Sequence, residues 1–144
     1  MIVVKRITAQ QTYNIRKEVL RKGINLPSQF TDDFDKDTFH LGVYEKDLLV
    51  GISSFMKTSN PDFGLEQYQL RGMATLTDVR GKGYGKLMLN EAFLILRDKQ
   101  IPVLWCNARE IAVNFYEEME FLKIGKLFLL PEIGMHYKMY KKIE

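Results

Sequence analysis

The chain is poor in cysteine and proline and has no long apolar run. Its 144 residues include one cysteine, Cys106, and four prolines, which excludes an internal disulfide and a disordered or fibrous composition. No segment approaches the roughly 18 consecutive apolar residues that cross a bilayer, and the first residues become charged too soon for a signal peptide. We therefore expect a protein of the reducing cytoplasm with no membrane partner.

An excess of charge of one sign is also lacking. The chain carries 21 Lys and Arg against 18 Asp and Glu, a net charge of +3. Proteins that bind nucleic acid usually carry a broader basic stripe, whereas the only local cluster here is Arg80, Lys82 and Lys86. A compact cluster suits a small anionic ligand, and nucleic acid is not an expected partner. The two histidines and the cysteine lie far apart in the sequence, so no metal site is expected.

The apolar content, the length and the order of the predicted elements indicate one layered domain. Apolar residues make up 46% of the chain, and the length fits a single domain over 1–144. Periodicity and turn signals predict the order β-α-β-β-β-α-β-α-β-β, an α/β (α+β) fold with a mixed sheet. The expected strands are 2–7, 39–44, 48–56, 66–76, 102–106, 122–130 and 135–143, and the expected helices are 9–22, 86–100 and 110–119. The segment 24–38 is expected to be loop with room for one short helix.

The side chains of the fourth predicted strand are expected to alternate regularly between the two faces of the sheet. Even-numbered residues such as Leu70 and Ala74 should face one way, and Arg71, Met73 and Thr75 the other. Arg71 would then either bind an acidic group of a ligand beside Met73 or pair with an aspartate of the preceding loop.

Three glycines alternate with other residues between this strand and the second helix, in Arg80-Gly81-Lys82-Gly83-Tyr84-Gly85-Lys86. Glycines allow a sharp turn with converging N–H groups, and the start of a helix adds unpaired N–H groups and a positive dipole end. With three cations, this loop is suited to a phosphate or pyrophosphate. It is not a P-loop, because Arg80 and Leu87 replace the required glycine and hydroxyl residue. Lys86 and Met88 likewise exclude the dinucleotide fingerprint, which needs a glycine at one of these positions.

Two segments fit known motifs at matching separations. Arg80, Gly83 and Gly85 fit the pattern R/Q-x-x-G-x-G/A, and 112–121 is similar to A-x-x-F-Y-x-x-x-G-F. Both motifs belong to the GNAT superfamily of N-acetyltransferases, which the chain resembles, and 70–76 resembles the cofactor strand of that family. The resemblance implies a three-layer fold with a mixed central sheet flanked by helices. It also implies an acetyl-CoA-dependent N-acetyltransferase that moves an acetyl group to a primary amine by direct attack in a ternary complex.

The resemblance further implies roles for single residues. One strand would hold the pantetheine arm by its backbone, the glycine loop would hold the pyrophosphate, and Tyr116 would be the catalytic proton donor near the sulfur. The strand that holds Val103 to Cys106 would splay from the cofactor strand and leave a gap for the arm. The implied cofactor-binding residues are Met73, Ala74, Thr75, Arg80, Gly81, Lys82, Gly83, Tyr84, Gly85, Lys86 and Asn107.

Two positions depart from the family pattern. The family usually has an asparagine seven residues before the tyrosine, where this chain has Arg109. Either Asn107, two residues earlier, replaces its contact to the cofactor, or the contact is absent. The family glycine before the final Phe121 is Glu120 here, so the turn after this helix is expected to differ.

The general base, the acceptor and the oligomeric state stay open. Glu66 could act through water or be a solvated strand end, and His136 could reach the acceptor or be structural. His40 and Cys106 fit a structural role better. The acceptor is expected to be a small-molecule or peptide amine, and a homodimer is compatible with the sequence. The alternative function is a non-catalytic acyl-CoA-binding module or sensor, which the lack of an evident base favours and Tyr116 disfavours.

Overall fold

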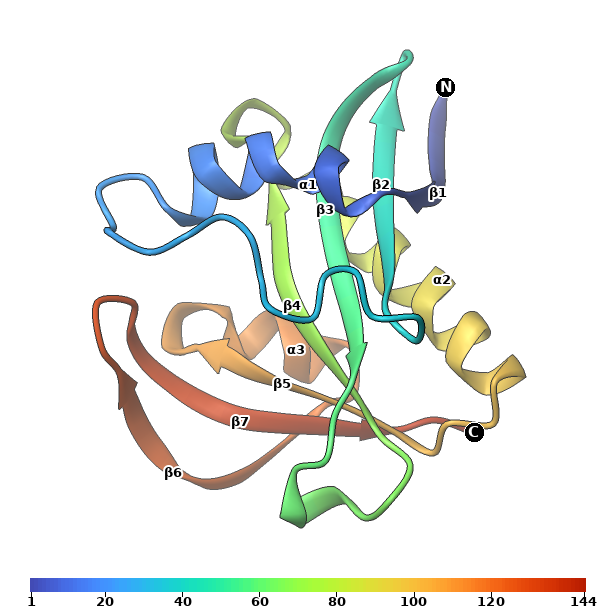
Figure 1. Ribbon diagram of the computed structural model, residues 1–144, viewed down its shortest axis with the longest axis vertical. Coiled ribbons are helices and arrows are strands. Elements are labelled where there is room, and N and C mark those ends of the chain that lie inside the picture. Colours follow the sequence, from blue (N-terminus) through green and yellow to red (C-terminus); the bar gives the residue numbers. More distant parts are fainter.

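Seven strands and three helices make up the computed structural model, which describes all residues from Met1 to Glu144 (Figure 1). The strands are β1 (Ile2–Ile7), β2 (Phe39–Glu45), β3 (Leu48–Lys57), β4 (Tyr68–Thr75), β5 (Val103–Arg109), β6 (Leu122–Leu130) and β7 (Gly134–Lys142). The helices are α1 (Ala9–Ile15), α2 (Tyr84–Asp98) and α3 (Val113–Glu118). Short helical turns are η1 (Arg16–Leu20), η2 (Pro61–Phe63), η3 (Thr77–Val79) and η4 (Glu110–Ala112). The strands form one sheet in the order β1-β2-β3-β4-β5-β7-β6, antiparallel throughout except between β4 and β5.

Helices cover both faces of this sheet. In Figure 1, α1 crosses the near face, whereas α2 and α3 lie behind the strands. Ile15 of α1 packs with Ile52 and Ala74, and Leu89 and Leu96 of α2 join a separate, larger apolar cluster. None of the helices has the length and apolar character needed to cross a membrane. The three layers and the element order confirm the predicted α/β (α+β) fold class with a mixed sheet.

The first helix begins where the sequence predicts it and ends slightly earlier. The Thr8 hydroxyl accepts from the Gln11 N–H at 3.3 Å, and the Gln11 side chain accepts from the Thr8 N–H at 2.8 Å, a complete capping box. The chain then continues as the π-helical turn η1, which ends at Leu20 and packs against β4. Segment 24–38 forms neither helix nor strand.

A β-bulge in β4 overturns the simple alternation predicted for this strand. Relative to β3, β4 holds one extra residue between Arg71 and Ala74, and Gly72 takes a left-handed backbone with φ of +65°. Arg71 therefore faces the α1 side, where its guanidinium lies 4.4 Å from the centre of the Phe30 ring. Met73 packs with the clusters on the α2 side. The prediction that Arg71 shares a face with Met73 is wrong, because the extra residue shifts the alternation of side chains between the two faces by one position.

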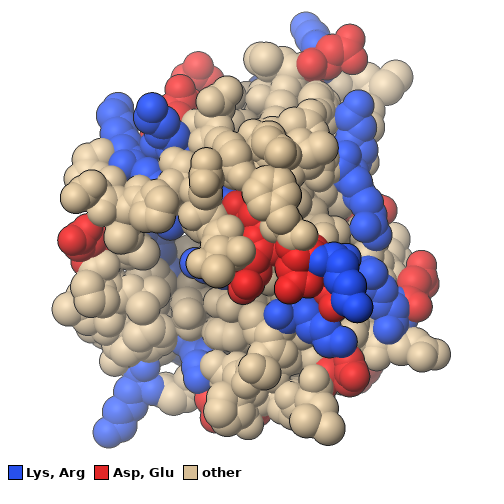
Figure 2. Space-filling view, in the orientation of Figure 1, with Lys and Arg blue, Asp and Glu red and all other residues tan.

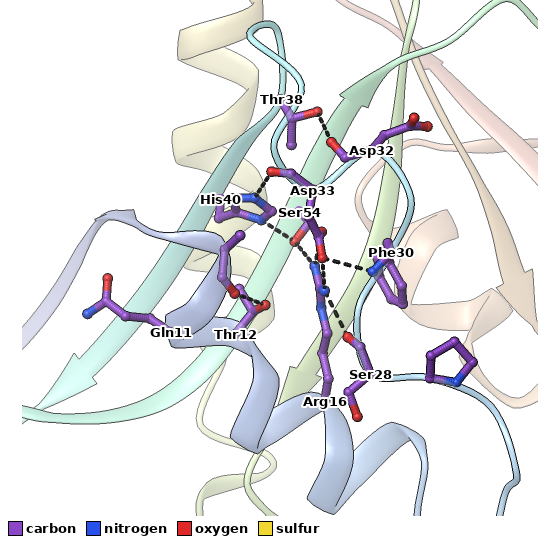
Figure 3. A network of polar contacts seen from close by, with 12 residues as sticks. Gln11, Thr12, Arg16, Ser28, Phe30, Asp32, Asp33, Thr38, His40 and Ser54 are labelled. Atoms are coloured by element: carbon purple, nitrogen blue, oxygen red, sulfur yellow. Dashed lines mark hydrogen bonds and ion pairs between the residues drawn. The ribbon is translucent and has the colours of Figure 1, made fainter.

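A buried ion pair fixes the loop before β2 to the α1 side of the sheet (Figure 3). The side chains of Arg16 and Asp33 are fully buried and are joined by two hydrogen bonds of 2.8 and 2.9 Å. Arg16 also donates to the Ser54 hydroxyl and to the Ser28 carbonyl oxygen, and its guanidinium lies 3.8 Å from the Phe30 ring centre. This single residue from η1 therefore holds a loop that has no secondary structure of its own.

His40 of β2 completes the network. Its Nε2 lies 3.0 Å from the Asp33 carbonyl oxygen, which can only accept, so Nε2 carries the proton. Nδ1 then accepts from the Ser54 hydroxyl at 2.7 Å. Burial lowers the pKa of His40, which keeps the ring neutral. These contacts agree with the structural role expected for His40.

The turn after α3 keeps a glycine-like backbone although glycine is absent. Glu120 has φ of +70°, and the Phe121 N–H donates to the Tyr116 carbonyl oxygen at 2.9 Å. This is the hydrogen bond with which helices often end on a left-handed residue. Glu120 therefore adopts the left-handed backbone that glycine favours, at the cost of some strain.

Candidate active site

A cleft opens where β4 and β5 part. The two parallel strands pair only at Tyr68–Leu104 and Gln69–Trp105 and then diverge, as Figure 1 shows. The edge of β4 beyond Gln69 therefore presents backbone N–H and C=O groups that no strand pairs. This is the splay that the sequence led us to expect.

Two adjoining chambers occupy the cleft, one of about 610 Å³ and one of about 410 Å³. They share the walls Leu20, Met73, Arg109, Ala112 and Tyr116. The larger, here called the glycine-loop chamber, is further lined by Val19, Ala74, Thr75, Val79, Arg80, Gly81, Gly83, Tyr84, Gly85, Lys86, Ile111 and Phe115. The smaller, here called the arginine chamber, is further lined by Arg21, Phe30, Gln69, Leu70, Arg71, Gly72, Cys106, Asn107, Leu130, Ile133 and His136. Because the walls are shared, one extended ligand can reach from the first chamber to the second.

The loop before α2 offers free backbone N–H groups to the glycine-loop chamber. Gly81 and Gly83 have φ of +83° and +82°, and no atom lies within 4 Å of the place where a Cβ would stand. No side chain caps the helix at Gly83, so the first-turn N–H groups of α2 are unpaired. Together with the helix dipole, these N–H groups are suited to a negatively charged group.

The three cations of this loop differ in their partners. Lys82 lies 3.2 Å from a carboxylate oxygen of Glu45, and Lys86 lies 3.3 Å from one of Glu118. Arg80, in contrast, forms no ion pair. Because solvent-exposed pairs contribute little free energy, both lysines can turn to a bound anion at small cost.

Two of the loop residues also have packing roles. The Tyr84 side chain is buried, and its hydroxyl donates to the Glu45 carboxylate. A Cβ on Gly85 would lie 3.1 Å from the Phe115 ring, so glycine at this position lets α2 approach α3 closely. The motif thus combines open space beside Gly81 and Gly83 with close packing at Gly85.

Tyr116 stands at the junction of the two chambers. Its ring packs edge-on against Phe115 and Phe121, and the residue is 8% exposed. Unlike the hydroxyl of Tyr84, that of Tyr116 has no hydrogen-bond partner in the protein. Burial raises the pKa of Tyr116, with a smaller contribution from Cys106, so the phenol keeps its proton. The hydroxyl is therefore a neutral donor on a residue that lines both chambers.

His136 of β7 is the one histidine that lines the cleft. Its Nδ1 lies 2.7 Å from the Gly134 carbonyl oxygen, so Nδ1 donates and Nε2 of the neutral ring holds a lone pair. The sequence left a structural and a functional role open for His136, and the structure places it in the wall of the arginine chamber.

Asn107 and Arg109 line different parts of the cleft. Asn107 lines only the arginine chamber, whereas Arg109 lines both chambers. Among the residues predicted to bind the cofactor, Asn107 is thus separated from the glycine loop. Lys82 does not line either chamber, and the others line the glycine-loop chamber.

Two other candidates are poorly suited to catalysis. Glu66 is exposed, lies 3.8 Å from Lys57 and lines neither chamber. Cys106 borders the arginine chamber but is 1% exposed, and burial raises the pKa of its thiol, which disfavours the thiolate.

Sequence reasoning missed Arg21, Phe30 and Ile133, which all line the arginine chamber. Arg21 follows a helix and Phe30 lies in a loop without periodicity, so no spacing rule connects either residue to β4. The one local signal for Phe30 was that it is an aromatic residue shortly after Pro27.

Comparisons with known proteins agree with this geometry. The model of the Acetyltransferase (GNAT) family matches residues 9–121. The uncharacterized N-acetyltransferase YitI of Bacillus subtilis (strain 168) is 34% identical over 145 residues, which cover 99% of this chain and 97% of YitI.

Solved structures show the same fold at low sequence identity. Escherichia coli ElaA has a TM-score of 0.81 at 16% identity, over 98% of this chain and 99% of the other. An aminoglycoside 6'-N-acetyltransferase complexed with coenzyme A has a TM-score of 0.75 at 11% identity, over 99% of this chain and 97% of the other. The family match and the relative YitI carry the assignment further than fold. The chain belongs to the GNAT family of acetyltransferases and is an acyltransferase.

Proposed function

We propose that residues 1–144 form one domain that transfers the acetyl group of acetyl-CoA to a primary amine, by direct attack in a ternary complex. The observation that carries this proposal is the continuous two-chamber cleft. It joins an anion site at the glycine loop, an unpaired strand edge and the neutral donor Tyr116. The coenzyme A in the related aminoglycoside enzyme supports the choice of cosubstrate.

The cosubstrate would lie along β4. Its pyrophosphate would accept hydrogen bonds from the N–H groups of the glycine loop. Arg80 would also bind it, because Arg80 forms no ion pair that would first have to break. The pantetheine amides would pair with the free edge of β4 as a short added strand. The residues proposed to hold it are Met73, Ala74, Thr75, Arg80, Gly81, Lys82, Gly83, Tyr84, Gly85 and Lys86, with Asn107 able to act only at the thioester end.

The acceptor would approach from the arginine chamber. Its neutral amine forms the C–N bond to the thioester carbonyl carbon, and a backbone N–H near Met73 stabilises the resulting oxyanion. The C–S bond then breaks, and the Tyr116 hydroxyl donates a proton to the leaving sulfur. Nε2 of His136, which lines the same chamber, would take the proton that the amine loses.

A covalent acetyl-enzyme is not part of this route. The nucleophile would have to be the thiolate of Cys106, which burial disfavours. Intact mass after incubation with acetyl-CoA alone should therefore not rise by one acetyl group.

One observation favours the alternative of a non-catalytic acyl-CoA sensor. No Asp or Glu lines either chamber, so the only candidate base is His136. The deciding experiment combines calorimetry with acetyl-CoA and a panel of amines that reports release of free thiol. Binding with amine-dependent thiol release supports the enzyme. Binding without release for any amine supports the sensor, and failure to bind refutes both.

A further inference from the structure

We propose that the amine acceptor carries a carboxylate or phosphate group, and that Arg21, Arg71 and Arg109 bind this anion in the arginine chamber. The inference rests on the proposed function, since it names the class of substrate that the same cleft accepts. It excludes polyamines and other purely cationic amines as preferred acceptors.

The first support is the one-sided charge of the chamber wall. Its 16 lining residues include three arginines and His136 but no Asp or Glu, although the chain has 18 acidic residues. None of the three arginines forms an ion pair with any carboxylate of the protein. Arginine in a pocket without an acidic partner is suited to binding a carboxylate or phosphate of a ligand.

The acidic residues nearest to the chamber do not form ion pairs with its arginines. Asp33 is bound on both oxygens by Arg16 and also accepts from the Phe30 N–H at 2.8 Å, and it forms no ion pair with Arg71. Figure 2 shows the remaining acidic side chains of this region gathered on the outer surface over segment 31–38. The alternative that Arg71 pairs with an aspartate of this loop is therefore wrong.

Phe30 supports two of the arginines in position. The guanidinium carbons of Arg71 and Arg21 lie 4.4 and 5.6 Å from its ring centre. Arg21 is also tied by its donation to the Pro27 carbonyl oxygen at 3.1 Å. Because stacking and hydrogen bonding already restrict these side chains, little further conformational entropy is lost when an anion binds.

The electrostatics of the arginine chamber support the same conclusion. Burial lowers the pKa of Arg21, and the charges of Arg71, Arg16 and Arg109 lower it further. Burial and Arg16 lower the pKa of Arg71 as well, against a partial opposing effect of Asp32 and Asp33. Like charges in a partly buried space repel, and a bound anion relieves this repulsion. The same positive field disfavours an ammonium group, which helps the acceptor to present a neutral amine.

The phosphates of the cosubstrate are a poor match for these arginines. The site for the pyrophosphate is the glycine loop, which lines the other chamber, and of the three arginines only Arg109 borders both. A volume of about 410 Å³ suits a small molecule instead.

The test compares acceptors that share one amine and differ in one charged group. Aspartate, glutamate and β-alanine are paired with their carboxamides, glucosamine phosphate is paired with glucosamine, and spermidine is added. The members of each pair are assayed with acetyl-CoA for thiol release and titrated into the coenzyme A-loaded protein by calorimetry. We expect kcat/KM or affinity at least about tenfold higher for the anionic member of one or more pairs. The carboxylate and phosphate arms distinguish the two anions.

Variants then assign the effect to the arginines. R71Q and R109Q should each raise KM for the preferred anionic acceptor by about tenfold or more, and R71Q, at a position that lines only the arginine chamber, should leave the affinity for acetyl-CoA nearly unchanged. R71K should recover part of the loss, and R97Q on the far end of α2 is the matched control. Because Arg109 is exposed, R109Q tests the idea even if R71Q folds poorly.

Each outcome decides a different claim. Equal or better use of neutral and cationic amines, or no binding of any anionic member, overturns the anionic acceptor while leaving the proposed function standing. A loss of acetyl-CoA affinity in R71Q shows that these arginines serve the cosubstrate. Absence of acetyl-CoA binding in the parent protein refutes the proposed function itself.

Discussion

Replacing Asp33 with asparagine should strongly destabilise this protein, because it breaks a fully buried ion pair from one side. The substitution keeps the size of the side chain but removes its negative charge. Arg16 would then keep a fully buried positive charge next to an amide, with its other partners, Ser28 and Ser54, both neutral. The unpaired charge, not the lost hydrogen bond, is the main cost.

The expected magnitude follows from the burial of the pair. Both side chains are 0% exposed, and breaking such a pair from one side costs about 3–5 kcal/mol. For a chain of this length, that free energy corresponds to a fall in Tm of about 10–15 °C. The loop that carries Phe30 should also loosen, so KM for the acceptor should rise more than KM for acetyl-CoA.

The pH dependence provides an independent check. Burial alone would raise the pKa of Asp33, but hydrogen bonds from Arg16 and from the Phe30 N–H outweigh it, and the pKa is lowered. A carboxyl group with a lowered folded-state pKa contributes stability above its unfolded value, near 3.8, and loses it as pH falls through the folded value. The stability difference between the parent and D33N should therefore be constant near neutral pH and shrink below about pH 4.

Urea denaturation at several pH values measures both effects. D32N is the matched control, because Asp32 lies next to Asp33 in the same loop but is exposed, and its effect should stay within about 0.5 kcal/mol. A loss below about 1 kcal/mol for D33N, or a difference that grows toward low pH, would refute the reasoning.

Four further predictions follow from the site and its surroundings. G83V should abolish measurable acetyl-CoA binding in calorimetry, whereas G64V, which has a similar φ of +79° in an open loop, should leave it intact; equal affinity would exclude this loop as the pyrophosphate site. Y116F should lower kcat by about tenfold or more with little change in acetyl-CoA affinity, and an unchanged kcat would make Tyr116 a packing residue. H136Q should lower kcat/KM by about 10²-fold with little change in acetyl-CoA affinity, and an unchanged kcat/KM would exclude His136 as the base. E120G should raise the stability by about 0.5–1 kcal/mol in thermal unfolding, because it removes the penalty of a positive φ at a side-chain-bearing residue, and a lower Tm would contradict this.

Local rules were enough for much of the fold and for one half of the cleft. The capping box at Thr8, the element order and the glycine loop from Arg80 to Lys86 depend on residues within a few positions of one another. Short sequence spacings therefore determine their geometry, so hydrophobic periodicity and turn residues are enough to predict it. The family motifs extend this to Tyr116, since its distance from the loop is also a property of the sequence.

Tertiary structure decided the other half of the cleft. The bulge at Gly72 arises from the register between β3 and β4, so the sequence of β4 alone predicted the wrong face for Arg71. The partners of the charged residues likewise depend on contacts between distant segments, and only the fold shows that Asp33 binds Arg16 and leaves Arg71 free. The sequence therefore predicted the gap beside β4 and the glycine loop that lines it. The charge of the arginine chamber arises only when the end of η1, the loop of Phe30, β5 and β7 meet around β4, because no short spacing connects them.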